Sequence, residues 1–115
     1  MLAIRLSYTQ LKKSTINANQ IISDFFHRSK YFDFQKANPG EKYYLSSFRF
    51  DSEGSRREHR VSLFIPLRRG DTNAEPRFWI YGLSKVMKPG DVMFLRFDKE
   101  ELYFSHSKKQ QSYLE

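Results

Sequence analysis

The sequence predicts a mostly β fold of the α+β class, a barrel or sandwich of about seven strands with two short helices. Two observations and one physical argument support this prediction. Short stretches alternate between apolar and polar residues, and short polar loops separate them. Phe, Tyr and Trp make up 17% of the 115 residues, enough apolar surface for one core. With strands of this number, closing the sheet removes exposed strand edges.

The amino-terminal part predicts a strand followed by a helix. Apolar residues at even positions from Leu2 to Tyr8 alternate with polar ones, which predicts a strand over residues 2–11. After a polar, basic stretch, apolar residues recur at helical spacing up to Phe26, and Asn17 is suited to cap this helix. The apolar face comprises Ala18, Ile21, Ile22, Phe25 and Phe26.

The remainder of the chain predicts further strands and one helical turn. Strands are expected at residues 43–50, 59–65, 77–81, 91–97 and 102–105, with polar loops at 51–57 and 67–75. Pro66 lacks an N–H group, so strand pairing should stop there. A helical turn at 83–87 precedes the turn Lys88-Pro89-Gly90. One domain over residues 1–105 and a polar tail over 106–115 are therefore expected.

Composition and charge narrow the classes of function. The chain has no Cys, which excludes disulfides and thiolate zinc sites. Its apolar runs are short, and Arg5 interrupts the amino terminus too early for a signal-peptide core, so a cytoplasmic protein is expected. The net charge of +7 and the pI of about 9.7 favour a polyanionic partner.

The sequence lacks the spacings that catalytic sites use. The three histidines (His27, His59 and His106) are far apart, and no glycine-rich phosphate-binding motif is present. Asp51 and Glu53 form an acidic pair but lack the lysine that a metal-dependent nuclease places nearby. A binding domain without a catalytic site, metal or cofactor is therefore expected.

Two polar, basic segments contain side chains of the kinds that can contact DNA. Arg and Lys can donate to guanine, Asn and Gln can pair with adenine, and Asp or Glu can accept from cytosine, while Lys, Ser and Thr also hold phosphates. The acids of the second segment suit base contacts or the orientation of Arg69 and Arg77. The candidates are Gln10, Lys12, Lys13, Thr15 and Asn17, then Arg68, Arg69, Asp71, Thr72, Asn73, Glu75 and Arg77.

Residues 77–97 have the order strand, short helix, Pro-Gly-Asp turn and strand. This order resembles the carboxy-terminal half of the B3-type DNA-binding domain of plant transcription factors. It is also similar to the related recognition domains of bacterial restriction endonucleases. The resemblance covers most of residues 2–105 as an order of elements rather than as matching letters.

The resemblance implies a seven-stranded open pseudobarrel capped by two short helices. It also implies two arms that enter the major groove of double-stranded DNA, a first arm at residues 8–17 and a second arm at residues 66–77. A nuclease domain or subunit of the same restriction system would then perform cleavage.

Two other functions remain open from the sequence. A reader of RNA or of modified, flipped bases, similar to PUA and EVE domains, needs an aromatic cage, which Trp79, Tyr81 and Tyr103 could supply. A protein-interaction barrel would use its charge only for solubility. Trp79 itself is expected in the core or at its rim. Arg56, Arg57 and Arg60 are expected to contact DNA backbone or nothing.

Overall fold

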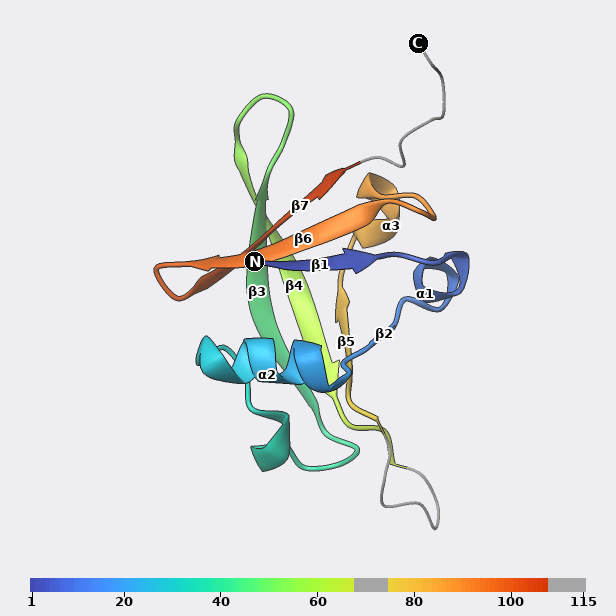
Figure 1. Ribbon diagram of the computed structural model, residues 1–115, viewed down its shortest axis with the longest axis vertical. Coiled ribbons are helices and arrows are strands. Elements are labelled where there is room, and N and C mark those ends of the chain that lie inside the picture. Colours follow the sequence, from blue (N-terminus) through green and yellow to red (C-terminus); the bar gives the residue numbers. More distant parts are fainter. Residues whose placement is uncertain (68–74, 108–115) are drawn as a thin grey trace.

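The computed structural model describes residues 1–67 and 75–107 (Figure 1). Its strands form one sheet in the order β1-β6-β7-β3-β4-β5-β2, which curls into an open half-barrel. The predicted mostly β, open pseudobarrel fold is thereby confirmed. The strands are β1 (Leu2–Arg5), β2 (Ile16–Asn17), β3 (Lys42–Phe50), β4 (Arg56–Phe64), β5 (Arg77–Ile80), β6 (Val92–Asp98) and β7 (Glu101–Ser107).

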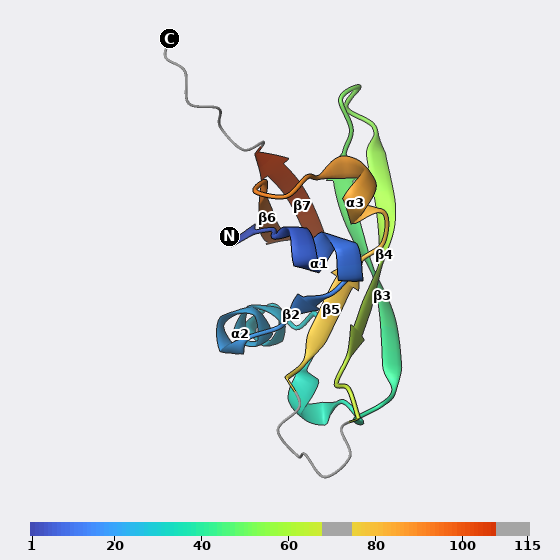
Figure 2. The same ribbon diagram turned by 90° about the vertical axis from the view of Figure 1, so that its right-hand side faces the viewer.

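Short helices lie between these strands. They are α1 (Tyr8–Lys13), α2 (Gln20–Arg28), the 3-10 turn η1 (Phe34–Lys36) and α3 (Leu83–Val86). In the described residues three α-helices thus replace the two expected, and α1 is the additional one. Figure 2 shows α1 and α2 on the same side of the long β3–β4 hairpin, with α3 directly above α1.

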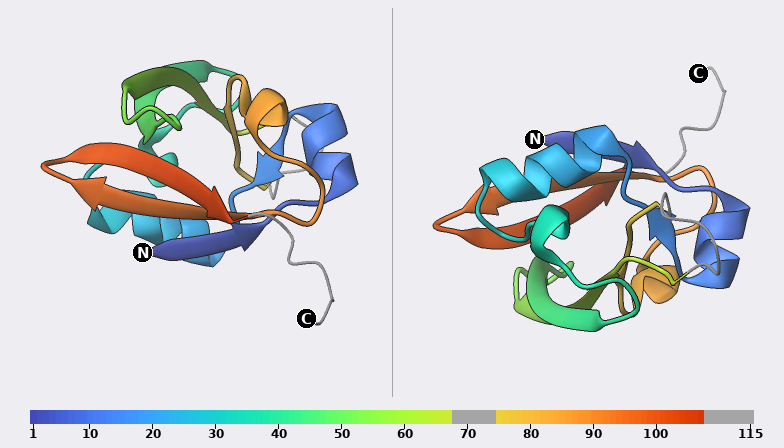
Figure 3. Two further views of the ribbon diagram at one scale, coloured as in Figure 1. Left: turned by 90° about the horizontal axis from the view of Figure 1, so that it is seen from above. Right: turned by 90° about the horizontal axis from the view of Figure 1, so that it is seen from below.

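The sheet is antiparallel except where β3 pairs with β7, which run parallel with Phe48 opposite Tyr103. The two edge strands are β1 and β2, each paired on one side only. The views along the long axis show β6 and β7 facing β3 and β4 across the interior (Figure 3). Strand β2 pairs only with β5, through Ile16 opposite Phe78 and Asn17 opposite Arg77. Two residue pairs that are distant in sequence therefore tie the first arm to the sheet.

The core fills the inside of the half-barrel, and α2 closes it. Phe26 of α2 is fully buried and packs edge-to-face on Phe78 of β5, with ring centroids 5.2 Å apart. Phe25, on the same helix, packs on Phe97 of β6, with ring centroids 5.1 Å apart. Burial also raises the pKa of Tyr31, whose hydroxyl donates to the carbonyl oxygen of Ser46 at 2.9 Å. The helix therefore joins both halves of the sheet.

The prediction of one strand over residues 2–11 is wrong beyond Arg5. Ser7 ends the extended segment because its hydroxyl and the Gln10 side chain form a capping box that starts α1. Tyr8, predicted on the buried face with Leu2, is 64% exposed instead. The local capping-box pattern Ser7-x-x-Gln10 therefore determines that a helix forms here, although the apolar alternation continues through these residues.

Further features differ from the prediction. Asn17 belongs to β2, and Asn19 caps α2 by accepting a hydrogen bond from the backbone N–H of Ile22 at 3.0 Å. Ile21, predicted on the buried helical face, is 64% exposed. The last strand, predicted over residues 102–105, begins at Glu101 and continues through Ser107. No helix in the described residues is long and apolar enough to cross a membrane.

Candidate nucleic-acid interface

The first arm is built by local hydrogen bonds. The Ser7 hydroxyl accepts from the backbone N–H of Gln10 at 3.1 Å, and the Gln10 side-chain oxygen accepts from the backbone N–H of Ser7 at 2.8 Å. Helix α1 ends at Ser14, whose φ of 53° is left-handed, and Thr15 then donates its hydroxyl to the Lys13 carbonyl at 3.2 Å. These contacts give the arm a fixed shape.

Buried residues anchor this arm to the sheet. Leu11 and Ile16 belong to the main core, and Ile16 is 1% exposed opposite Phe78 of β5. The backbone N–H of Ala18 donates to the carbonyl oxygen of Pro76 at 2.7 Å. The end of the first arm therefore lies beside the end of the second arm.

A polar groove of about 480 Å³ opens between α1, β2 and the start of β5. We call it the arm groove. Lys13 and Arg77 contribute positive charge, and no carboxylate lies among the described residues that line it. Its lining consists of Ser7, Thr9, Gln10, Lys13, Thr15, Asn17 and Arg77. A groove with two cations, several neutral donors and no acid favours an anionic ligand.

Arg77 lines this groove as the first residue of β5. It lies opposite Asn17 in the β2–β5 ladder and is half-buried. Its Nε atom is buried and has no hydrogen-bond partner among the described residues, which is rare because an unsatisfied buried donor costs about 1–3 kcal/mol. An acceptor supplied by a ligand would satisfy it.

The structure brings together five of the sequence-predicted site residues. Gln10, Lys13, Thr15, Asn17 and Arg77 all line the arm groove.

Of the other candidates, Lys12 extends over the ring of Tyr8, 5.8 Å from its centroid, and does not line the groove. Glu75 is exposed and lines a different pocket. Arg68, Arg69, Asp71, Thr72 and Asn73 lie outside the described residues.

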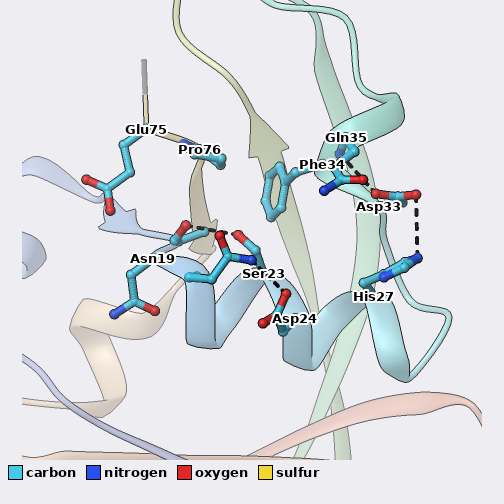
Figure 4. A pocket seen from close by; sticks show the side chains of 11 residues that line it. Asn19, Ser23, Asp24, His27, Asp33, Phe34, Gln35, Glu75 and Pro76 are labelled. Carbon is cyan, nitrogen blue, oxygen red and sulfur yellow. Dashed lines mark hydrogen bonds and ion pairs between the residues drawn. The ribbon is translucent and has the colours of Figure 1, made fainter. Parts of the chain in front are cut away.

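The pocket that includes Glu75 has the opposite electrostatic character. It measures about 290 Å³ and lies beside α2 and η1, with Asp24, Asp33 and Glu75 around it (Figure 4). Asp33 accepts from the backbone N–H of Gln35 at 2.9 Å and lies 3.6 Å from the His27 ring nitrogen. Three carboxylates against one histidine would repel a phosphate backbone, so this pocket borders the candidate interface rather than belonging to it.

The acidic pair considered for metal binding has a structural use. Asp51 accepts from the backbone N–H groups of Glu53 and Ser55 and from Arg57 Nε at 2.8 Å. The backbone hydrogen bond from Ser55, followed by the Arg57 contact, holds the pKa of Asp51 below its ordinary value of 3.8. In the part of the chain that the structure describes, no cluster of His, Cys, Asp or Glu has the arrangement of a metal site.

Three arginines of β4, Arg56, Arg57 and Arg60, contact other side chains of the protein. Arg56 forms an ion pair with Glu101, and its guanidinium lies 3.7 Å from the centroid of the Phe48 ring. Arg57 is paired with Asp51. Arg60 lies over the ring of Tyr44 at 5.3 Å.

Two of the three aromatic residues of the alternative cage, Trp79 and Tyr103, lie in different surroundings. Trp79 is 6% exposed and belongs to the core, as expected from the sequence. Tyr103 stacks on Phe50, and Arg96 lies 4.6 Å from its ring centroid.

Two groove residues were not identified from the sequence, namely Ser7 and Thr9. The capping-box pattern Ser7-x-x-Gln10 was the available signal, because a helix at this point turns Thr9 and Lys13 toward the same side.

No family model, curated protein or solved structure matches the chain.

Proposed function

We propose that the chain binds double-stranded DNA sequence-specifically, with its two arms in the major groove of the duplex. It is the target-recognition domain of a restriction system, and a nuclease domain or subunit elsewhere performs cleavage. The chain itself is a binding domain and not an enzyme. The single observation that supports this most is the arm groove, which gathers polar and cationic side chains from distant parts of the sequence.

The groove suits a nucleic acid because its described residues offer donors without competing acids. Lys13 and Arg77 supply the charges for phosphate contacts, which set affinity and register. The exposed side-chain amide of Asn17 has the donor and acceptor that pair with an adenine edge. Within the described part of the chain, the Gln10 side chain uses only its oxygen, in the capping box, which leaves its amide donors available.

The anchoring of the arm also supports this function. Base recognition needs donors held in one geometry before the duplex arrives, since ordering them on binding would cost affinity. Buried Leu11, Ile16 and Ala18 fix the first arm on the sheet. Its residues 8–17 and the described ends of the second arm, Pro66 and Arg77, are the positions that the B3-like resemblance assigns to the two arms.

Salt-dependent binding tests this proposal. Affinity for a randomised duplex pool should fall as salt rises, and each phosphate contact contributes about 0.9 to the slope of log K against log [salt]. Lys13→Gln should therefore reduce the slope by about 0.9. Lys99→Gln, at the β6–β7 turn far from the groove, is the matched control and should leave it unchanged. Negligible or salt-insensitive duplex binding would overturn the proposal in favour of a protein-interaction barrel.

A further inference from the structure

Two segments of the chain contain basic residues and no acidic ones. Residues 1–23 have Arg5, Lys12 and Lys13 without Asp or Glu, and residues 76–90 have Arg77, Lys85 and Lys88 without Asp or Glu. The chain as a whole has 13 acidic residues, and all of them lie outside these two segments.

The fold brings these two segments together. Helices α1 and α3 are in contact, and all views show them side by side at one end of the half-barrel (Figures 1–3). The backbone N–H of Gly90 donates to the carbonyl oxygen of Leu6 at 2.8 Å, and Arg5 Nη1 donates to the carbonyl oxygen of Gly90 at 2.9 Å. The turn after α3 is therefore bonded to the segment that leads into α1.

The carboxylate that follows this turn in the sequence belongs to a buried residue. Asp91 is 5% exposed, and its side chain accepts from the backbone N–H of Lys88 at 2.9 Å. This bond, with the left-handed φ of 93° at Gly90, fixes the turn. Lys85 and Lys88 are exposed, and the three ion pairs found among the described residues include neither of them. The positive charge at this end is thus left for an external anion.

The structure assigns Lys85 and Lys88 to the nucleic-acid interface, as contacts to the phosphate backbone of the duplex beside the arm groove. This inference rests on the proposed function and extends it. The duplex would lie across α1 and α3, with the arm groove on the α1 side and the two lysines on the α3 side. Lysine is a flexible point charge, so these contacts add affinity and register without sequence preference.

The test compares two double variants with the same change of charge. Lys85→Gln/Lys88→Gln removes the two lysines beside α3. Lys30→Gln/Lys99→Gln removes one lysine that follows α2 and one in the β6–β7 turn. Figure 1 shows the end of α2 and this turn on the opposite side of the molecule from α1 and α3. Both are titrated with a randomised duplex pool between 50 and 200 mM salt, after thermal melts confirm that they fold.

We expect the slope of log K against log [salt] to be smaller by about 1.8 in Lys85→Gln/Lys88→Gln than in the wild type. The slope of the control variant should be unchanged. Equal losses in both variants would mean that only net charge matters and would overturn the inference. A loss in Lys13→Gln without a loss in the α3 variant would overturn the inference and leave the proposed function standing. If the wild-type chain binds no duplex, both fail together.

Discussion

Ile16→Ala tests whether β2 fixes the first arm to the sheet. Ile16 is 1% exposed and lies opposite Phe78, which is fully buried. The change removes three carbons from the core, each worth about 0.8 kcal/mol of transfer free energy, or about 2.4 kcal/mol together. The cavity that remains adds to this loss, so the free energy of unfolding should fall by about 2–5 kcal/mol.

Urea denaturation followed by tryptophan fluorescence measures this loss, because Trp79 is buried beside the affected ladder. Thermal melts should show a decrease on the order of 10 °C or more. Ile21→Ala is the matched control, since Ile21 is 64% exposed and should change stability by no more than about 0.5 kcal/mol. If both variants lose the same small amount, β2 is not docked on β5 and the arm is not held in advance.

Three further predictions concern caps, backbone and charge. Asn19→Ala should lower the free energy of unfolding by about 0.5–2 kcal/mol in urea melts, because it removes the α2 cap, while Asn17→Ala should not. Ser14→Gly should raise the melting temperature slightly, since the left-handed φ costs Ser more than Gly loses in unfolded-state entropy. Because the folded-state pKa of Asp51 is lowered, its charge stabilises the protein above pH 3.8 and this is lost as pH falls through the folded value. Asp51→Asn should therefore melt below wild type at pH 7, with the gap closing toward pH 2.

Most of the sheet could be predicted because its strands alternate. In β4 of the β3–β4 hairpin, the fully buried apolar residues Val61 and Leu63 are separated by the polar Ser62, and this period of two is visible in the sequence. The first arm could not be predicted in this way. Alternation through Leu6 and Tyr8 favours a strand, whereas the local hydrogen bonds between Ser7 and Gln10 favour a helix and prevail.

The candidate site could be predicted from the sequence only in part. Residue chemistry singled out Gln10, Lys13, Thr15, Asn17 and Arg77, and the structure gathers these five in one groove. That gathering depends on the two-residue strand β2 and its pairing with β5, which has too short a pattern to be seen in sequence.

The position of the remaining described residues depends on tertiary packing. Glu75 lines the acidic pocket beside α2 and not the arm groove, although it is only two residues from Arg77. Lys85 and Lys88 lack a motif of their own, and only the contact between α1 and α3 places them near the first arm.

Selection of bound duplexes from a random library tests the central claim most directly. Repeated rounds with the wild-type chain should enrich one short base sequence, and Asn17→Ala should relax the preference at one position of it, by about 1–3 kcal/mol. Bound duplexes with no shared sequence after several rounds would contradict specific recognition and leave only a general affinity for polyanions.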